Sequence, residues 1–133
     1  AQQAVKIAAA KVSMPLMEVF FRGILCNALV CMAVWMAFAG RNVTDKFIAI
    51  VFPISAFVAA GFEHSVANMY FIPLALLQQA SAPLALPGAE LIDAWHMLRN
   101  LAAAILGNIV GGSVLVALVY HVIYHRSRVA GDT

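Results

Sequence analysis

Charged residues are scarce in this sequence: Asp, Glu, Lys and Arg together make up only 11% of the 133 residues. Apolar residues make up 64%, against about 45–50% in a typical soluble domain, so the chain has too few polar side chains to cover a water-exposed surface. The formal net charge is only +2 and Lys and Arg form no run, which argues against binding to nucleic acid or another polyanion. The composition therefore predicts an all-α membrane protein.

Cysteine is also scarce, and the two that occur, Cys26 and Cys31, lie in one apolar tract. A helix would point side chains at this spacing in different directions, so neither a disulfide nor a metal-binding pair is supported. We expect both to behave as small buried apolar residues. The sequence predicts no metal site and no resident cofactor.

Three long apolar tracts dominate the rest of the chain. Residues 16–39 and 98–124 each suit one membrane-spanning helix, which needs ~20 residues. The middle tract, 47–77, is longer: a straight helix over it would measure ~47 Å at ~1.5 Å per residue, against a hydrocarbon core of ~30 Å. Gly61 lies near its centre. We therefore predict three spans, the second made of two half-helices that are separated by a break at 61–65.

Charge in the connections predicts how these spans are oriented. The 41–46 connection and the C-terminal tail 125–133 contain Arg or Lys, whereas the 80–95 connection contains neither. By the positive-inside rule, 41–46 and the tail are cytoplasmic and 80–95 is outside. Residues 1–13 are helix-prone but too short and polar to span, so we predict an interfacial or re-entrant helix there.

Three cations contradict this orientation. Lys6, Lys11 and Arg22 would all lie toward the outer side, where the rule disfavours them. At least one of them is therefore expected to have a role other than setting topology.

The third tract contains a ladder of small residues, Ala103, Gly107 and Gly111, spaced four apart. Such ladders let a neighbouring helix backbone approach closely, so we expect helix packing here. Asn108 lies beside the ladder, and the sequence allows it either to bond to another helix or to line a lumen.

The predicted break carries the ionisable residues Glu63 and His64. Irregular backbone at bilayer depth is tolerated only where protein or a water-filled cavity satisfies it. Ionisable residues there are costly and are usually functional, and broken helices commonly hold the ligand sites of transporters. A Glu63–His64 pair that only satisfies itself is the structural alternative.

A histidine at this depth suits the transport of a small carboxylic acid. Such an acid has a pKa of ~4 and is almost wholly ionised at pH 7, and an unpaired carboxylate crosses an apolar constriction only at a prohibitive desolvation cost. Protonation removes most of that cost. The pattern therefore favours a site that attracts an anion and supplies a proton through His64.

At these residues the sequence resembles a known family. The stretch GFEHSVANMYFIP, residues 61–73, is similar to the signature of the formate/nitrite transporters, and LCNALVCMAVWMAFAGR, FPISAFVAAGFEHS and LGNIVGG resemble neighbouring segments of formate channels. The resemblance covers nearly the whole chain. It implies an aquaporin-like protomer in a homopentamer of the bacterial inner (plasma) membrane, with one pore per protomer. The implied substrate is formate or a related monovalent anion such as nitrite or hydrosulfide.

The resemblance also assigns roles to matching positions. His64 resembles the central pore histidine, and Glu63 and Asn68 resemble its polar supports. Asn27 is similar to the asparagine of the preceding span that faces this site, and Lys11 to the lysine that attracts anions, which would explain one misplaced cation. The residues similar in position to those that narrow the pore are Phe57 and Val30. Ordinary packing for these two, and snorkelling for Lys11, are the alternatives.

Family members are about twice as long as this chain and consist of two inverted halves, each with a broken helix. The chain therefore resembles the second half of a six-span protomer. We expect residues 1–133 to form the C-terminal half of one transmembrane channel domain. Such a half leaves one face of its pore uncovered. We expect it neither to conduct nor to fold usefully without the N-terminal half of the same protein.

Two alternatives to a transporter are a haem-binding membrane anchor and an intramembrane hydrolase. A membrane anchor for haem would use pairs of histidines on different spans at one depth, and the spacing of the four histidines disfavours this. An intramembrane hydrolase using Ser65 or Glu63 lacks a nucleophile-elbow or HExxH pattern. The candidate haem ligands are His64, His96, His121 and His125.

Overall fold

The computed structural model describes residues 2–124, and its regular elements over that range are all helical. The fifth helix continues without interruption to Tyr124 through a widened, π-helical stretch, η2. The elements in chain order are α1 (Gln2–Val12), α2 (Leu16–Ala39), α3 (Val43–Ala59), α4 (Ser65–Ser81), the short 3₁₀ turn η1 (Ala89–Leu91), α5 (Ala94–Ile109) and η2 (Val110–Leu118).

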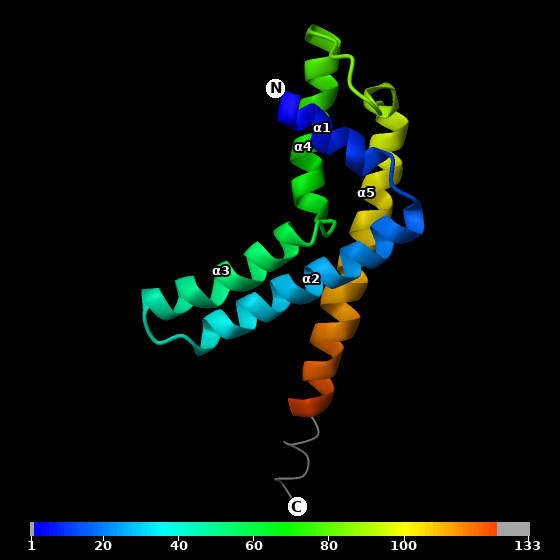
Figure 1. Cartoon of the computed structure of the whole chain (residues 1–133). Coiled ribbons are helices and arrows are strands. Elements are labelled where there is room, and N and C mark those ends of the chain that lie inside the picture. The colour runs from blue at the N-terminus through cyan, green and yellow to red at the C-terminus, as the bar shows by residue number, and fades with distance from the viewer. Residues whose placement is uncertain (1, 125–133) are drawn as a thin grey trace, which may run out of the picture.

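Figure 1 shows two helix pairs that meet at the break between α3 and α4. The hairpin of α2 and α3 extends to one side, whereas α4 and α5 run beside each other with α1 lying across them (Figure 1). Helix α2 crosses α5 and η2 in close contact because both present glycines there. A Cβ added to Gly107 or Gly111 would overlap the backbone carbonyl oxygens of Phe20 or Ile24, so the small-residue ladder is a packing surface.

The buried apolar core lies where α1 packs against α4. Val5, Ala8, Ala9 and Val12 recur at helical spacing on one face of α1 and are almost fully buried. They meet residues of α4 and the loop that follows it, namely Ile72, Ala75 and Ile92. The small alanines bring α1 close to α4, and Lys11 lies in the last turn of this packed helix.

The middle apolar tract is divided between α3 and α4, and its helices extend beyond the expected limits of 47–77. Asn42 caps α3 by accepting a hydrogen bond from the Asp45 backbone N–H at 2.8 Å, so that helix begins four residues early. Pro53 and Pro73 lie inside the two helices. Similarly, Asp93 caps α5 by accepting from the His96 backbone N–H, and this bond lowers the pKa of the Asp93 carboxyl.

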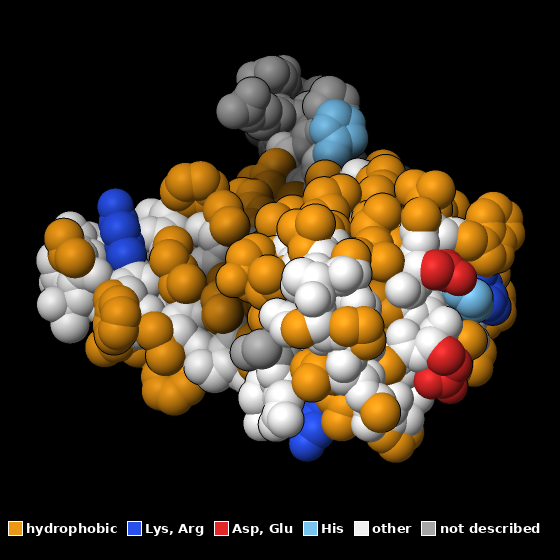
Figure 2. Space-filling model, turned by 90° about the horizontal axis from the view of Figure 1, so that it is seen from above, with side chains coloured by type: hydrophobic (Ala, Val, Ile, Leu, Met, Phe, Trp, Pro, Cys, Tyr) orange, Lys and Arg blue, Asp and Glu red, His pale blue; other side chains and the backbone are white. Residues whose placement is uncertain are grey.

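Within residues 2–124, two helices are long and apolar enough to cross a membrane, Leu16–Ala39 and Ala94–Tyr124. Much of the remaining surface is also apolar. None of the 17 residues of α3 is buried, and Phe47 and Phe52 are 66% and 71% exposed. Figure 2 shows hydrophobic side chains over most of one face, with charged groups scattered toward its edges. Such a surface is suited to lipid or to further protein, not to water.

Candidate functional site

The break between α3 and α4 holds the predicted pair Glu63 and His64. Gly61 adopts a positive φ of 65°, which glycine tolerates without a Cβ clash. His64 then has extended backbone and acts as the N-cap of α4: its ring Nδ1 accepts a hydrogen bond from the Ala67 backbone N–H at 3.3 Å. In the neutral ring, Nδ1 is therefore the acceptor and Nε2 carries the hydrogen.

Glu63 is 1% exposed, and each of its carboxylate oxygens has a partner. Lys11 Nζ donates to Oε1 at 2.7 Å, and Asn68 Nδ2 donates to Oε2 at 2.6 Å. The carboxylate thus bonds to α1 and α4. The alternative of a self-satisfied Glu63–His64 pair does not describe this arrangement, because Glu63 spends both oxygens on other residues.

Asn100, in the second turn of α5, completes a closed set of hydrogen bonds. Its Oδ1 accepts from Asn68 Nδ2 at 2.8 Å, and its Nδ2 donates to the backbone oxygen of Lys11 at 2.9 Å. We call Lys11, Glu63, Asn68 and Asn100 the polar ring. Asn68 and Asn100 are 0% and 3% exposed, so the ring is a buried network in which each bond matters for stability.

The orientation of the Asn68 amide follows from this ring. Both of its contacts, Glu63 Oε2 and Asn100 Oδ1, are acceptors, so its nitrogen must face them. Its own Oδ1 has no hydrogen-bond partner among the described residues. Asn68 thereby serves the ring as a donor.

Asn108 connects the break to α2. Its Nδ2 donates to the backbone oxygens of Gly23 and Glu63, at 2.9 and 3.0 Å, and its Oδ1 accepts from the Ser65 backbone N–H at 2.9 Å. The backbone carbonyl oxygen of Asn108 in turn accepts a hydrogen bond from Asn27 Nδ2 at 2.6 Å. Asn108 therefore satisfies backbone groups on both sides of the break, the helix-bonding role that the sequence left open.

A second cation also holds the break. Arg22 Nη1 donates to the Gly61 backbone oxygen at 2.9 Å, and Arg22 Nη2 pairs with Glu18 at 2.7 Å one helical turn earlier. Of the three cations that contradict the charge rule, Lys11 and Arg22 both bond to the break, whereas Lys6 is exposed on α1. The role of Arg22 could be suspected from its misplaced charge, but its partner could not.

A pocket of about 350 Å³ opens beside the break. Lys11, Phe57 and His64 line it, and the rings of Phe57 and His64 stack with centroids 5.7 Å apart. The pocket therefore combines a cation, an imidazole and an apolar wall. The other predicted constriction residue, Val30, is half-buried on α2 and is not part of this lining.

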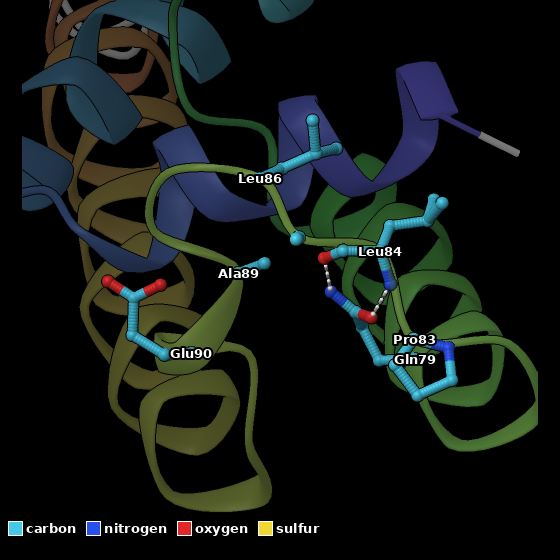
Figure 3. Close-up of a pocket in the computed structure, with 7 residues that line it drawn as sticks. Gln79, Pro83, Leu84, Leu86, Ala89 and Glu90 are labelled. Carbon is cyan, nitrogen blue, oxygen red and sulfur yellow. Dashed lines mark hydrogen bonds between the residues drawn. The ribbon is translucent and has the colours of Figure 1, made fainter.

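Another pocket lies in the loop after α4, away from the predicted site residues. Figure 3 shows the Gln79 amide exchanging two hydrogen bonds with the backbone of Leu84, while Glu90 lies on the opposite side with its carboxylate directed away from Gln79. None of the predicted site residues lines it. Because Gln79 spends its polar atoms on the loop backbone, its role there is to shape the loop.

The predicted haem ligands do not converge where the structure describes them. His64 lies at the break, whereas His96 bonds to Asp93 at the start of α5 and His121 lies near the other end of the same continuous helix. His125 lies outside the described residues. Over residues 2–124 no group of three His, Cys, Asp or Glu side chains could hold a metal ion.

A buried polar network at a helix break, inside an apolar helical chain, is the arrangement by which transport proteins hold ligand sites within a membrane. The chain belongs to the formate/nitrite transporter family, whose sequence model matches residues 1–122. It is therefore a membrane protein of a transporter family, not an enzyme.

Individual relatives support this assignment. The chain is 43% identical over 115 residues to the formate channel FocB of Escherichia coli, covering 80% of this chain and 41% of FocB. It is 44% identical over 122 residues to a probable formate transporter of Methanothermobacter thermautotrophicus, covering 89% of this chain and 40% of that protein. The chain thus spans about two fifths of the length of these relatives.

Solved structures agree. A pentameric formate channel with formate bound superposes with a TM-score of 0.77 at 34% identity, over 91% of this chain and 51% of that one. An ion channel of the same family gives a TM-score of 0.77 at 38% identity, over 88% of this chain and 43% of the other. None of these relatives is a haem anchor, so the comparisons give the haem alternative no support.

Proposed function

We propose that this chain is the C-terminal half of a channel that carries formate, or a related small monovalent anion such as nitrite or hydrosulfide, across the bacterial inner membrane. The observation that carries the proposal is the pocket at the break, where Lys11 and His64 lie beside the ring of Phe57. Relatives named as formate channels, and the pentameric structure with formate bound, make formate the first candidate and a homopentamer the expected assembly.

In the membrane, α2 and the continuous helix from α5 to Tyr124 would be the first and third spans, while α3 and α4 would together form the broken second span. The connection between α2 and α3 and the tail 125–133 would then be cytoplasmic, and α1 would lie near the outer side. The complete protomer would add an inverted N-terminal half and so an aquaporin-like pore. The uncovered apolar surface of α3 supports this arrangement, because α3 buries none of its residues here.

Entry of the anion is assigned to Lys11. Its ammonium contacts Glu63 through one of three donor positions, and Lys11 is one of the residues that line the pocket. Glu63 is 1% exposed and does not line the pocket, so we expect its charge to offset that of Lys11 only in part there. A monovalent anion would therefore be attracted and then released, as conduction requires.

His64 is assigned the central step. While Nδ1 accepts the hydrogen bond from Ala67, the hydrogen of the neutral ring is on Nε2. This Nε2–H can donate a hydrogen bond to an anion. A neutral ring that gave up this hydrogen would become an imidazolate, so proton supply needs the imidazolium, with both nitrogens as donors. Protonation of Nδ1 therefore requires His64 to release Ala67. Transfer from the imidazolium would let the solute pass the apolar wall as its uncharged acid.

The test uses the complete protein in proteoliposomes, with formate uptake measured between pH 5 and 8. We expect saturable uptake whose rate depends on pH, and we expect His64→Phe to remove that dependence while keeping the ring stack with Phe57. His96→Phe, at the start of α5, is the matched control and should keep the wild-type profile. A wild-type pH profile in His64→Phe would contradict the protonation role, and absence of saturable uptake by the wild type would contradict transport itself.

A further inference from the structure

Asn100 has two hydrogen bonds whose directions cannot be exchanged. Its Nδ2 faces the Lys11 backbone oxygen, which can only accept, and its Oδ1 faces Asn68 Nδ2, which can only donate. An amide of fixed orientation therefore joins α5 to the end of α1 and to α4. Neither bond reaches the pocket, so Asn100 touches no transported solute.

The bond to Lys11 fixes the end of α1 by a directional contact. Apart from the Lys11–Glu63 ion pair, the anchors of α1 are apolar residues, Val5, Ala8, Ala9 and Val12, that pack on α4. Apolar packing is not directional, whereas a hydrogen bond requires a defined distance and angle. Asn100 thus sets the register of the last turn of α1, which is the turn that carries Lys11.

The same amide acts on the partner of Lys11. Asn68 donates to both Glu63 Oε2 and Asn100 Oδ1 through one nitrogen, so loss of Asn100 would free Asn68 to turn away from Glu63. Both ends of the Lys11–Glu63 ion pair therefore depend on Asn100. The side chains that form the pair are 15% and 1% exposed, so solvent offers little compensation.

We propose that Asn100 is a positioning residue that holds the Lys11 ammonium at the pocket and thereby sets the apparent affinity for the anion. This inference rests on the proposed transport function. It predicts a specific kinetic signature: the half-saturation concentration should change more than the maximal rate, because Lys11 is assigned to anion entry and His64 to the later step.

The experiment is a double-variant cycle on the complete protein in proteoliposomes, with formate as the probe. We expect Asn100→Leu and Lys11→Met each to raise the half-saturation concentration about tenfold, the loss that one hydrogen bond to a charged network produces. If Asn100 acts through Lys11, the double variant should have a half-saturation concentration less than about twofold above that of Lys11→Met alone. If the two residues acted independently, the fold-changes of the two single variants would instead multiply in the double variant.

A second variant keeps the size of the side chain. Asn100→Asp can still accept from Asn68 but, as a carboxylate, cannot donate to the Lys11 carbonyl, so it should also raise the half-saturation concentration. Asn42→Asp is its matched control, because the α3 cap only accepts a hydrogen bond and tolerates the same change. If Asn100→Leu fails to assemble, Asn100→Asp takes its place in the cycle with Lys11→Met and tests whether Asn100 acts through Lys11.

The outcomes separate the two proposals. Suppose that the wild type shows saturable uptake. Multiplicative effects, or an unchanged half-saturation concentration in the Asn100 variants, would then overturn the role of Asn100 but not the transport function. Loss of thermal stability without a kinetic change would show that Asn100 only joins helices, and would overturn it as well. No saturable uptake by the wild type would overturn both.

Discussion

Glu63 is the residue whose environment determines the chemistry of the break. Its carboxylate is 1% exposed and is held by one cation and one neutral amide. Burial of a charge is tolerated only when good partners replace water, so the charge on Glu63 and the charge on Lys11 stabilise each other. The two are unequal, however, because the Lys11 side chain is 15% exposed.

This inequality predicts the order of two single variants. Lys11→Met leaves a buried carboxylate with only Asn68, and we expect it to lower the free energy of unfolding by about 3–5 kcal/mol. Glu63→Gln should cost less, because Lys11 can turn toward solvent. Thermal unfolding of the complete protein in detergent measures both.

The Lys11→Met, Glu63→Gln double variant removes both charges and serves as the control for the ion pair. It should be more stable than Lys11→Met alone, since no unpaired charge remains. A double variant that is less stable than either single variant would show that the side chains act through shape and not through their ion pair.

Individual polar residues also show where prediction from the sequence ends. Glu63 and His64 are predicted as site residues from their place at the break, and Asn68 and Lys11 by resemblance; the structure brings all four to the break. Asn100 was not, because its bonds cross 32 and 89 positions of sequence and depend on how α5 is rotated. Only its place near the start of an apolar tract could have drawn attention.

At the scale of elements, tract length was the informative signal. An apolar run too long for one straight helix, with Gly61 near its middle, predicted a break where α3 ends at Ala59 and α4 begins at Ser65. Boundaries were less predictable. The start of α3 follows from the Asn42 cap, and such a cap is a local hydrogen bond that hydropathy does not register.

The contact between α2 and η2 allows a test on adjacent glycines. Gly111 faces the Ile24 backbone, whereas Gly112 faces the end of the Asn27 side chain. Gly111→Ala should therefore force the helices apart and destabilise the fold by about 1–3 kcal/mol, because a backbone cannot turn aside. Gly112→Ala should mainly displace the Asn27 amide and so lower transport more than stability.

Parallel measurements of unfolding in detergent and of formate uptake separate the two effects. Leu106→Ala, on the exposed face of α5, is a reference for substitution on this helix away from the α2 contact. Equal loss of stability in Gly111→Ala and Gly112→Ala would contradict the distinction between backbone and side-chain neighbours.

At the scale of the whole molecule, the chain leaves much of its apolar surface without protein contact. Helix α3 buries no residue, and Val58, which lines the pocket at the break, is 65% exposed. The curated relatives are longer, since this chain covers 41% of FocB and 40% of the archaeal transporter. A pore wall made by residues outside these 133 would cover both the pocket and the exposed face of α3.

That proposal makes the activity of the isolated chain a decisive measurement. Residues 1–133 reconstituted alone should show no saturable formate uptake, because an open pocket provides neither a closed path nor a dry constriction. Co-expression with the remaining part of the protein as a separate chain should restore uptake, and His64→Phe in this chain should alter the pH dependence of the restored activity. Saturable, His64-dependent uptake by the isolated chain would instead mean that copies of this half close the pore among themselves, and the N-terminal half would then be dispensable for conduction.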